Sequence, residues 1–268
     1  MASALETFNM SVFSLGGDSF LGLVQNVTID ISNTIVETKS INVGYGRGQI
    51  EKSMAKISAT VMGNDQGTTK RIDHLMVSAF TIGGTSYLGK LRSGKIAVNA
   101  TVVKKPEVGT RWVWTQITDK MLTIDGEFDV PTGAADALQT LAKGVVANQS
   151  VIVSLTLDDT SDVIYTAPMV IESLQLGAEM GGLYKVTMKL TGQCPDAGTA
   201  FPTAPTGTTS LFEKALNSRA AVAVALTTQS SNGNSYSCNA CIASAELDIS
   251  DEQIITATYS LESQGTVT

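Results

Sequence analysis

Two cysteines near the end of the chain have the spacing of a zinc knuckle. Cys238 and Cys241 are separated by two residues, and Cys194 together with His74 would complete a set of four ligands. The chain has three cysteines in all, and an odd number does not make a disulfide framework. A zinc site and a disulfide between Cys238 and Cys241 are therefore the two kinds of cysteine chemistry to weigh.

An internal repeat argues against the metal site. At an offset of 71 positions, Ala167 and Val170 correspond to the two clustered cysteines. Apolar residues in the other copy indicate that the cysteines are small core or strand residues. We expect no bound metal and no cofactor, and a disulfide stays possible.

Catalytic residues are equally sparse. His74 is the single histidine, and it follows Asp73 on what we expect to be the polar side of a helix. A hydrolase, with a Ser-His-Asp triad or another nucleophile, would have no other candidate base. We therefore expect a protein that is not an enzyme.

The elements that must position these residues begin with a duplicated strand pair. Residues 20–61 match residues 87–128 at a constant offset of 67, with alternating apolar residues and one retained glycine. Such positions specify strands and their register. The expected strands are 24–39, 52–62, 90–103 and 119–130.

The rest of the chain repeats a second unit. At an offset of 71, Val151 corresponds to Val222 and Leu190 to Leu261, and the pattern again predicts strands. The expected strands of the first copy are Ser150–Leu157, 163–176 and 183–191. Short helices are expected over 68–79, 133–143 and Leu211–Asn217.

This order of front half, front half, back half and back half predicts one domain nested inside another. Domain A comprises residues 1–80 and 206–268, domain B comprises 81–198, and residues 199–205 form a linker. The expected fold class is mainly β, with two tandem or nested antiparallel β-sandwich domains that are each flanked by a short α-helix. Pairing of the halves in a swapped sense is the alternative.

Composition excludes several classes of function. A hydrophobic content of 43 % with 16 % charged residues indicates a globular protein, and no apolar run is long enough to span a bilayer. The start of the chain lacks the pattern of a signal peptide, so we expect synthesis in the cytoplasm and no membrane partner. A net charge of −7 argues against tight binding to nucleic-acid phosphates.

Three strands carry a resemblance to a known family. They are Val27-Thr-Ile-Asp-Ile-Ser with its continuation over 35–40, the returning strand Ser53-Met-Ala-Lys-Ile-Ser-Ala-Thr-Val, and the closing strand Tyr184-Lys-Val-Thr-Met-Lys-Leu-Thr-Gly. Together with the helix after the returning strand, they resemble the phage tail tube, or major tail, protein family in strand order over most of the chain. The resemblance implies that six domains close into a ring with one continuous inner barrel, and that rings stack into a conduit for the genome.

The chain departs from that family in size, because a common subunit has one such domain and this chain has two. The resemblance then implies a homotrimer with a pseudo-sixfold ring, or alternatively a homohexamer. We favour the trimer, because domain B is nested in domain A and shares its plan. Other implied partners are the terminator, distal tail and tape measure proteins, with double-stranded DNA only in transit, and the implied location is the virion tail.

Two loops are candidates for contacts between rings. The long hairpin loop of the family corresponds to residues 37–51 in one copy and 104–118 in the other. Tyr, Trp and Arg are frequent anchors of protein interfaces, although a solvated hairpin would have the same composition. The candidate contacts are Tyr45, Arg47, Arg111, Trp112 and Trp114.

Four acidic residues on the expected strands are candidates for the lining of the conduit. They are Asp30, Glu37, Asp125 and Glu127. An anionic lining would repel DNA phosphates, whereas the same residues on an outer face would serve only solubility. The hypothesis is a virion structural protein that acts by self-assembly, and the alternative is a non-enzymatic β-sandwich adhesin or carbohydrate-binding module.

Overall fold

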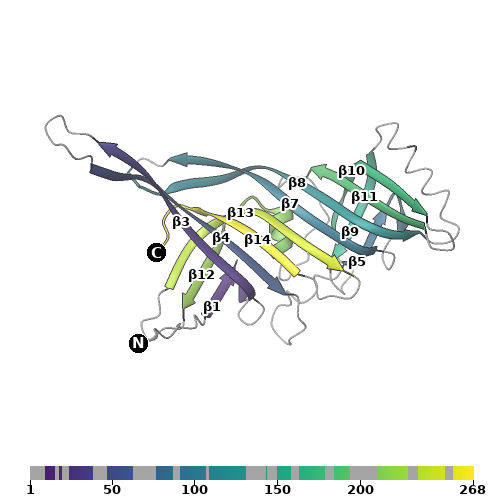
Figure 1. Ribbon diagram of the computed structural model, residues 1–268, viewed down its shortest axis with the longest axis horizontal. Helices are drawn as coiled ribbons and strands as arrows, with labels where there is room; N and C mark the ends of the chain where they lie inside the picture. Colours follow the sequence, from purple (N-terminus) through teal and green to yellow (C-terminus); the bar gives the residue numbers. More distant parts are fainter. Residues whose placement is uncertain are drawn as a thin grey trace.

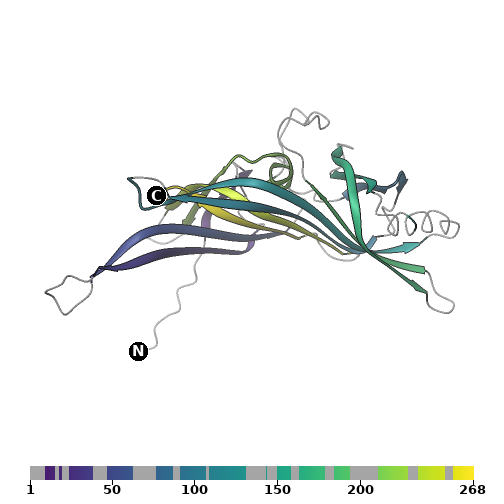
Figure 2. The ribbon, with the colours of Figure 1, turned by 90° about the horizontal axis from the view of Figure 1, so that it is seen from above.

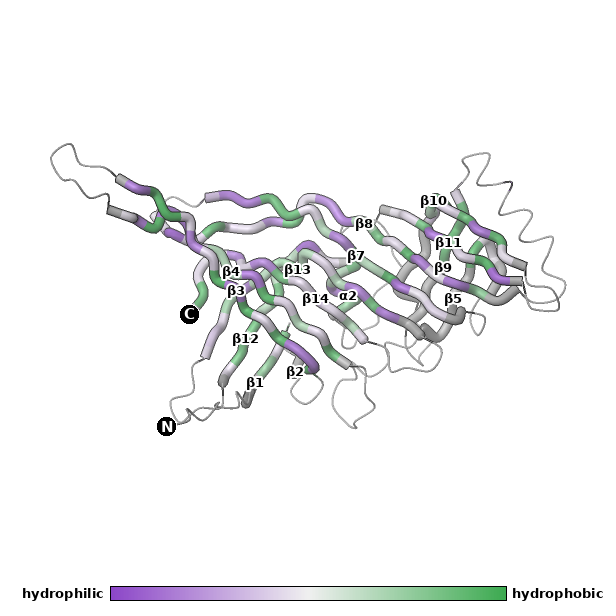
Figure 3. Tube along the Cα trace, in the orientation of Figure 1, coloured by the Kyte–Doolittle hydropathy of each residue, from purple (hydrophilic) through white to green (hydrophobic). Residues whose placement is uncertain are grey.

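The computed structural model describes residues 10–15, 18–19, 24–38, 47–62, 77–86, 91–106, 109–130, 143, 150–157, 163–178, 184–193, 211–228, 235–250 and 256–268. Nearly all of these residues belong to strands that pair antiparallel, and helix α2 spans Leu211–Asn217. The mainly β, antiparallel class predicted from the alternation of apolar residues is confirmed. Figure 3 shows this alternation along the long strands.

Seven described strands, drawn from both ends of the chain, form a first set. Their pairing order is β2-β1-β12-β13-β14-β4-β3. Their bounds are Met10–Leu15 (β1), Asp18–Ser19 (β2), Val24–Thr38 (β3), Arg47–Met62 (β4), Val222–Thr228 (β12), Ser235–Ser250 (β13) and Thr256–Gln264 (β14).

Seven described strands from the middle of the chain form a second set with the same plan. Their pairing order is β6-β5-β9-β10-β11-β8-β7. Their bounds are Val77–Ile82 (β5), Thr85–Ser86 (β6), Leu91–Pro106 (β7), Val113–Val130 (β8), Ser150–Leu157 (β9), Val163–Ala178 (β10) and Tyr184–Gln193 (β11).

The two sets repeat each other down to individual residue pairs. Val61 pairs with Ala257 in the first set, and Phe128 pairs with Val186 in the second. Phe128 follows Val61 by 67 positions and Ala257 follows Val186 by 71, which are the two repeat offsets of the sequence. The bulges recur as well, in β3 and β7 and in β13 and β10. One architecture is therefore built twice.

Pairing between β7 and β13 joins the sets into one sheet of 14 strands (Figure 1). β13 changes partner along its length, because residues 235–240 pair with β12 and residues 244–250 pair with β7. The strands β12, β1 and β2 thus branch away from the broad part of the sheet, which has the strand order β3-β4-β14-β13-β7-β8-β11-β10. Figure 2 shows that the long strands of the broad part are strongly curved. Such curvature is what a sheet needs in order to close on itself.

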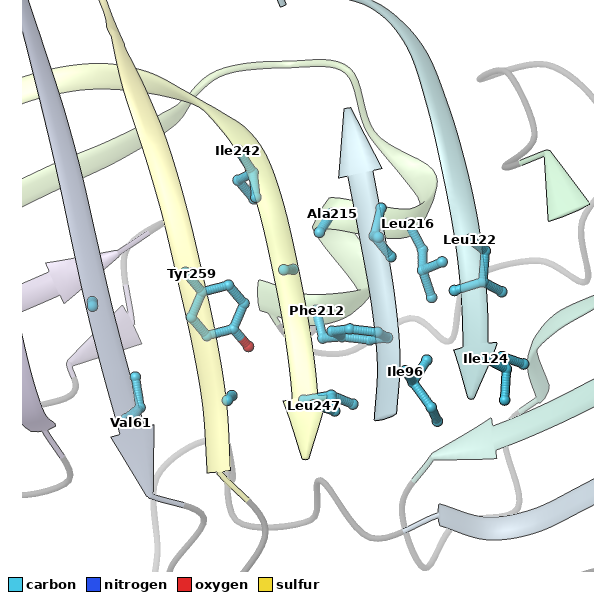
Figure 4. Packing of buried hydrophobic residues seen from close by; sticks show 14 of the residues in the cluster. Val61, Ile96, Leu122, Ile124, Phe212, Ala215, Leu216, Ile242, Leu247 and Tyr259 are labelled. Atoms are coloured by element: carbon cyan, nitrogen blue, oxygen red, sulfur yellow. The ribbon is translucent and has the colours of Figure 1, made fainter. Parts of the chain in front are cut away.

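The core lies on the face of the broad sheet that the branch strands and α2 cover. One apolar cluster includes Phe13 of β1, Leu226 of β12, Tyr259 of β14 and Phe212 of α2. Figure 4 shows side chains of β4, β14, β13, β7 and β8 arrayed beside α2. Full burial of each large apolar side chain contributes about 1.5–3 kcal/mol.

The structure corrects one expected helix. Residues 77–79, at the end of the helix expected over 68–79, belong to β5, and Ala79 pairs with Thr156 of β9. An edge of an existing sheet satisfies these backbone groups better than the end of a short helix would. The rest of that expected helix lies outside the described residues, as does the helix expected over 133–143 apart from Lys143, which is helical. The helix over Leu211–Asn217 is confirmed as α2.

Candidate assembly surface

The junction between the two sets provides the template for how such units can join. β7 lies beside β13 in antiparallel register, and Ile96 is opposite Leu247. Both side chains are buried in the common core, below Phe212 and Leu216 of α2 (Figure 4). The two sets are thus joined by the pairing of β7 with β13 within the sheet and by the packing of α2 against the core face of these strands.

A buried lysine binds the C-terminal end of α2 across this junction. Lys120 of β8 is 2 % exposed, and its Nζ donates hydrogen bonds to the carbonyl oxygens of Ala215, Leu216 and Ser218 at 2.9, 2.6 and 3.0 Å. These carbonyls lie at the C-terminal end of α2, where the helix leaves acceptors unpaired and where positive charge is favourable. Lys120 therefore ties the second set to the helix that precedes β12. The sequence predictions missed this residue, because an isolated lysine on an expected strand looks like a solvent-exposed one.

A second set of contacts lies near the turn of the β7–β8 hairpin. Thr115 Oγ1 donates to the carbonyl of Ser263 at 2.9 Å, and the amide side chain of Gln264 donates to the carbonyl of Thr115 at 2.9 Å. The backbone N–H of Ser53 donates to the carbonyl of Arg111 at 2.7 Å. The hairpin of the second set is thereby held against β4 and β14 of the first.

Two long strand edges at the ends of the row of curved strands have no second partner among the described strands. β3 pairs only with β4, and residues 173–178 of β10 pair only with β11. β3 is the equivalent of β7, and this part of β10 is the equivalent of the part of β13 that β7 pairs with. The free edge of β3 is therefore equivalent to the β7 side of the internal junction, and the free edge of β10 is equivalent to its β13 side. The two edges lie at opposite ends of the row of strands β3-β4-β14-β13-β7-β8-β11-β10.

Apolar residues on these edges are exposed where their equivalents are buried. Ile31 of β3 is 46 % exposed and Leu176 of β10 is 62 % exposed. Their repeat equivalents at the internal junction, Val98 and Leu247, are 2 % and 0 % exposed. An exposed, long and apolar strand edge is a site for pairing with another chain.

The face of the broad sheet opposite the core carries charges of both signs. Asp248, Lys95, Asp125 and Lys189 lie in one row across β13, β7, β8 and β11. Negative and positive side chains alternate along this row. The acids expected to face a conduit are thus accompanied by lysines, which the same alternation places on the same face.

Ion pairs on this face shift the affinity of its groups for protons. Lys189 Nζ is 2.8 Å from Glu172 Oε1, and Thr191 Oγ1 donates to Glu172 Oε2 at 3.0 Å. The hydrogen bond from Lys189, with that from Thr191, holds the pKa of Glu172 below its ordinary value. In the same way, a hydrogen bond to Glu246 raises the pKa of Lys95.

The four acids predicted for the lining are on strands. Asp30 is exposed on β3 opposite Lys56, and Asp125 is exposed on β8. Glu127 is half-buried on the same face, with Oε1 at 3.7 Å from the Nζ of Lys185. Glu37 is exposed near the end of β3, on the part of the β3–β4 hairpin that projects from the body (Figure 1).

The predicted contacts between rings lie in or beside the two hairpins. Tyr45 is outside the described residues, and Arg47 is the first residue of β4. Arg111 is exposed, Trp112 is half-buried, and Trp114 is 42 % exposed on β8. The strands extend further into both expected loops than the sequence predicted.

Trp112 also makes a contact within the chain. It forms an isolated parallel bridge with Ser53 of β4. Next to this bridge, a cleft of about 280 Å³ lies between the two hairpins. Its lining residues are Ser32, Thr34, Lys52, Ser53, Met54, Lys104, Pro106 and Val113.

The cysteines offer no metal site among the described residues. Cys238 is half-buried and Cys241 is buried, both are free thiols, and burial raises the pKa of each. The other two expected ligands, Cys194 and His74, lie outside the described residues. No group of three or more His, Cys, Asp or Glu side chains in the described part of the chain is placed to hold a metal ion.

Within the described ranges, no helix is long and apolar enough to cross a membrane.

Comparison with known proteins adds a structural likeness. No family model matches the chain, and no curated protein matches it. Among solved structures, the chain is similar to one from the tail of an empty GTA particle, computed with helical refinement and C6 symmetry. The match has 15 % sequence identity and a TM-score of 0.32, and it covers 38 % of this chain and 76 % of that chain. At this level of similarity the match identifies neither a family nor a function for the chain.

Proposed function

We propose that copies of this chain assemble edge to edge, with β3 of one copy pairing with residues 173–178 of β10 in the next. The repeat offsets convert the internal pair of Ile96 and Leu247 into Ile29 and Leu176. The same register and the same antiparallel sense then apply at both junctions. The single observation that carries this proposal is the matched pair of open edges on either side of a duplicated unit.

The energetic argument rests on the residues that such pairing would cover. Ile31 and Leu176 would be buried, and covering a large part of each side chain is worth about 1–2 kcal/mol. The backbone groups of both edges would also gain partners, which removes the risk of uncontrolled pairing that open edges carry. A chain with one edge of each kind joins head to tail, and such contacts close into a ring when the rotation allows it.

The stoichiometry follows from the duplicated unit. We propose that the first set of strands belongs to a discontinuous domain A and the second to an inserted domain B, which begins before Val77 because β5 pairs with β9. Three chains would then supply six units in a pseudo-sixfold ring, as the resemblance to tail tube proteins implies. A homohexamer is the alternative arrangement.

We propose that the rings stack into the tube of a phage-like tail, located in the virion, with no catalytic role. The polar face of the broad sheet would line the bore, and its mixed charges would let double-stranded DNA pass without being held. The terminator, distal tail and tape measure proteins would be its other partners. The turn ends of the two hairpins, with Tyr45, Arg47, Arg111, Trp112 and Trp114, would contact the adjacent ring.

Electron microscopy and light scattering of the purified chain test this function. We expect rings with a central bore and a mass near 84 kDa, which is three times the 28.1 kDa of one chain. Rings of six chains would overturn the trimer and keep the edge pairing. Persistent monomers would contradict the proposal and favour an adhesin or carbohydrate-binding module.

The hairpin contacts have their own test. Changing both Trp112 and Trp114 to Ala should leave single rings and abolish their stacking into tubes. Because Trp112 also bridges Ser53, circular dichroism must show that the double variant keeps the native fold. Tubes of normal length from the folded double variant would rule out these residues as contacts between rings.

A further inference from the structure

We propose that the β3–β4 hairpin is an arm that seats on the next copy of the chain, across β10 and β11 near Val170. This inference rests on the proposed edge pairing and adds a second, separate contact surface to it. The arm is defined here as residues 33–38 and 47–53, and the seat as Val170 with residues 191–193. The occupant of the seat is therefore a second copy of this chain.

The internal hairpin shows what such seating looks like. Ile117, on the β7–β8 hairpin, is 3 % exposed, and Cys241 of β13 beneath it is 1 % exposed. The Sγ of Cys241 donates to the carbonyl of Thr115 at 3.5 Å, so the hairpin backbone lies directly over this position. The hairpin of the second set thus covers a residue of the first set within one chain.

The equivalent residues of the free hairpin and the free seat are both exposed and both apolar. Ile50 corresponds to Ile117 and is 37 % exposed, while Val170 corresponds to Cys241 and is 52 % exposed. Not every exposed residue of the arm behaves in this way. Val36 is exposed and so is its equivalent Val103, so one face of each hairpin is exposed to solvent. The two hairpins thus differ in exposure only on the face with Ile50, which is the face that would meet the next copy.

The proposed contact lacks the two side chains found at the equivalent internal positions. Thr115 and Ser263, whose groups form the internal hydrogen bond, correspond to Gly48 and Gly192. Gly192 is buried, and a Cβ placed on Gly48 would lie 3.2 Å from Cγ2 of Ile35. The two glycines would face each other in the proposed contact, where the absence of side chains lets backbones pack directly. We therefore expect an apolar contact through Ile50 in place of the hydroxyl bond.

Cysteine cross-linking distinguishes the seat from the edge pairing. The Ile50→Cys, Val170→Cys double variant should be linked between copies by a short bismaleimide, giving dimers and closed trimers on denaturing gels. The matched control is Gln49→Cys with Val170→Cys, because Gln49 lies on the opposite face of the hairpin and its equivalent, Gln116, is exposed. We expect at least tenfold less product from the control. The single-cysteine parents measure any contribution of the native cysteines.

The outcomes separate this inference from the proposed function. Rings in the microscope together with equal linking of the two double variants, or with linking of neither, would overturn the seat and leave the ring intact. An absence of both rings and links would overturn both. Strong linking of Ile50→Cys with Val170→Cys, confirmed by mass spectrometry of the joined peptides, would support the seat.

Discussion

The β7–β8 and β3–β4 hairpins have the same register and the same bulges, yet their surroundings differ completely. The first is clasped over β4 and β14 of its own chain through Thr115 and Ser263. The second projects from the body, with Ile35 and Ile50 exposed (Figure 1). The two hairpins thus differ in whether strands of the same chain cover them, and not in the strand pairing within each hairpin. In the proposed assembly, an exposed apolar residue with a buried repeat equivalent marks a contact that a second copy would complete.

Sequence differences between the hairpins follow the same division. The permanent internal junction has Lys120 fixing the end of α2, and the equivalent position in the first set is Ser53. The internal clasp uses Thr115, and the free arm has Gly48 in its place. Strong polar bonds are thus concentrated where the two units never separate. The proposed junction between copies would use apolar and backbone contacts, which can form after each copy has folded.

The largest effect should come from placing a charge on the free edge. Leu176→Lys would bury a charge at the proposed junction, so we expect association to weaken by about a hundredfold or more. The matched control is Ile152→Lys, because Ile152 is exposed and its repeat equivalent, Ala223, is exposed too. Sedimentation velocity measures both variants. Ring formation by Leu176→Lys, or its loss in Ile152→Lys, would contradict the edge assignment.

Replacing the equivalent leucines at the two junctions should affect the free energy of unfolding to very different extents. Leu247→Ala leaves a cavity in the core and should lower the free energy of unfolding by about 3 kcal/mol. Leu176→Ala should change it by less than about 0.5 kcal/mol, because this side chain is exposed in a single copy. Urea unfolding in an Ile31→Lys background, which keeps copies apart, provides the comparison. Equal losses would mean that Leu176 belongs to the core of the monomer.

The lysine that fastens α2 should have an intermediate effect. Lys120→Met keeps the aliphatic stem but leaves three carbonyl oxygens without their donor, which should cost about 2–3 kcal/mol. Lys56→Met, on the exposed face of β4, should change stability by less than about 0.5 kcal/mol. Both values come from the same urea experiment. An unchanged stability of Lys120→Met would show that the junction does not depend on this cap.

The smallest effect concerns the polar face. Because the pKa of Glu172 is lowered by Lys189, its contribution to stability is present above the pKa of an unfolded glutamate and is lost as pH falls through the lower, folded value. Lys189→Met should return the pKa of Glu172 towards its ordinary range while leaving unfolding at neutral pH nearly unchanged. Carbon-detected NMR titration measures this shift. An unchanged pKa would show that the ion pair does not form in solution.

Strand positions could be predicted well from sequence, because period-two alternation is a direct consequence of burying one face. The strand Ser150–Leu157 was predicted with the bounds that the structure gives. Strands β4 and β8 were predicted to start too late, at residues 52 and 119, because one extra residue in each, Glu51 and Thr118, shifts the alternation and makes the pattern look broken.

A signal in the sequence could have found β5. The first repeat extends upstream of residue 20, since Phe13-Ser-Leu-Gly-Gly matches Phe80-Thr-Ile-Gly-Gly at the same offset of 67. Extending the match would have predicted strand instead of helix over 77–79. The role of Lys120 could not be predicted, because it depends on where α2 ends in space.

Hydrogen exchange of the assembled particle tests the central claim most directly. The amides of β7 and of residues 244–250 of β13 provide the reference for a closed junction within the same molecule. We predict that, on assembly, the outward amides of β3 and of residues 173–178 of β10 become as slow to exchange as this reference. Amides of β3 that exchange as fast in particles as in single copies would contradict the edge pairing.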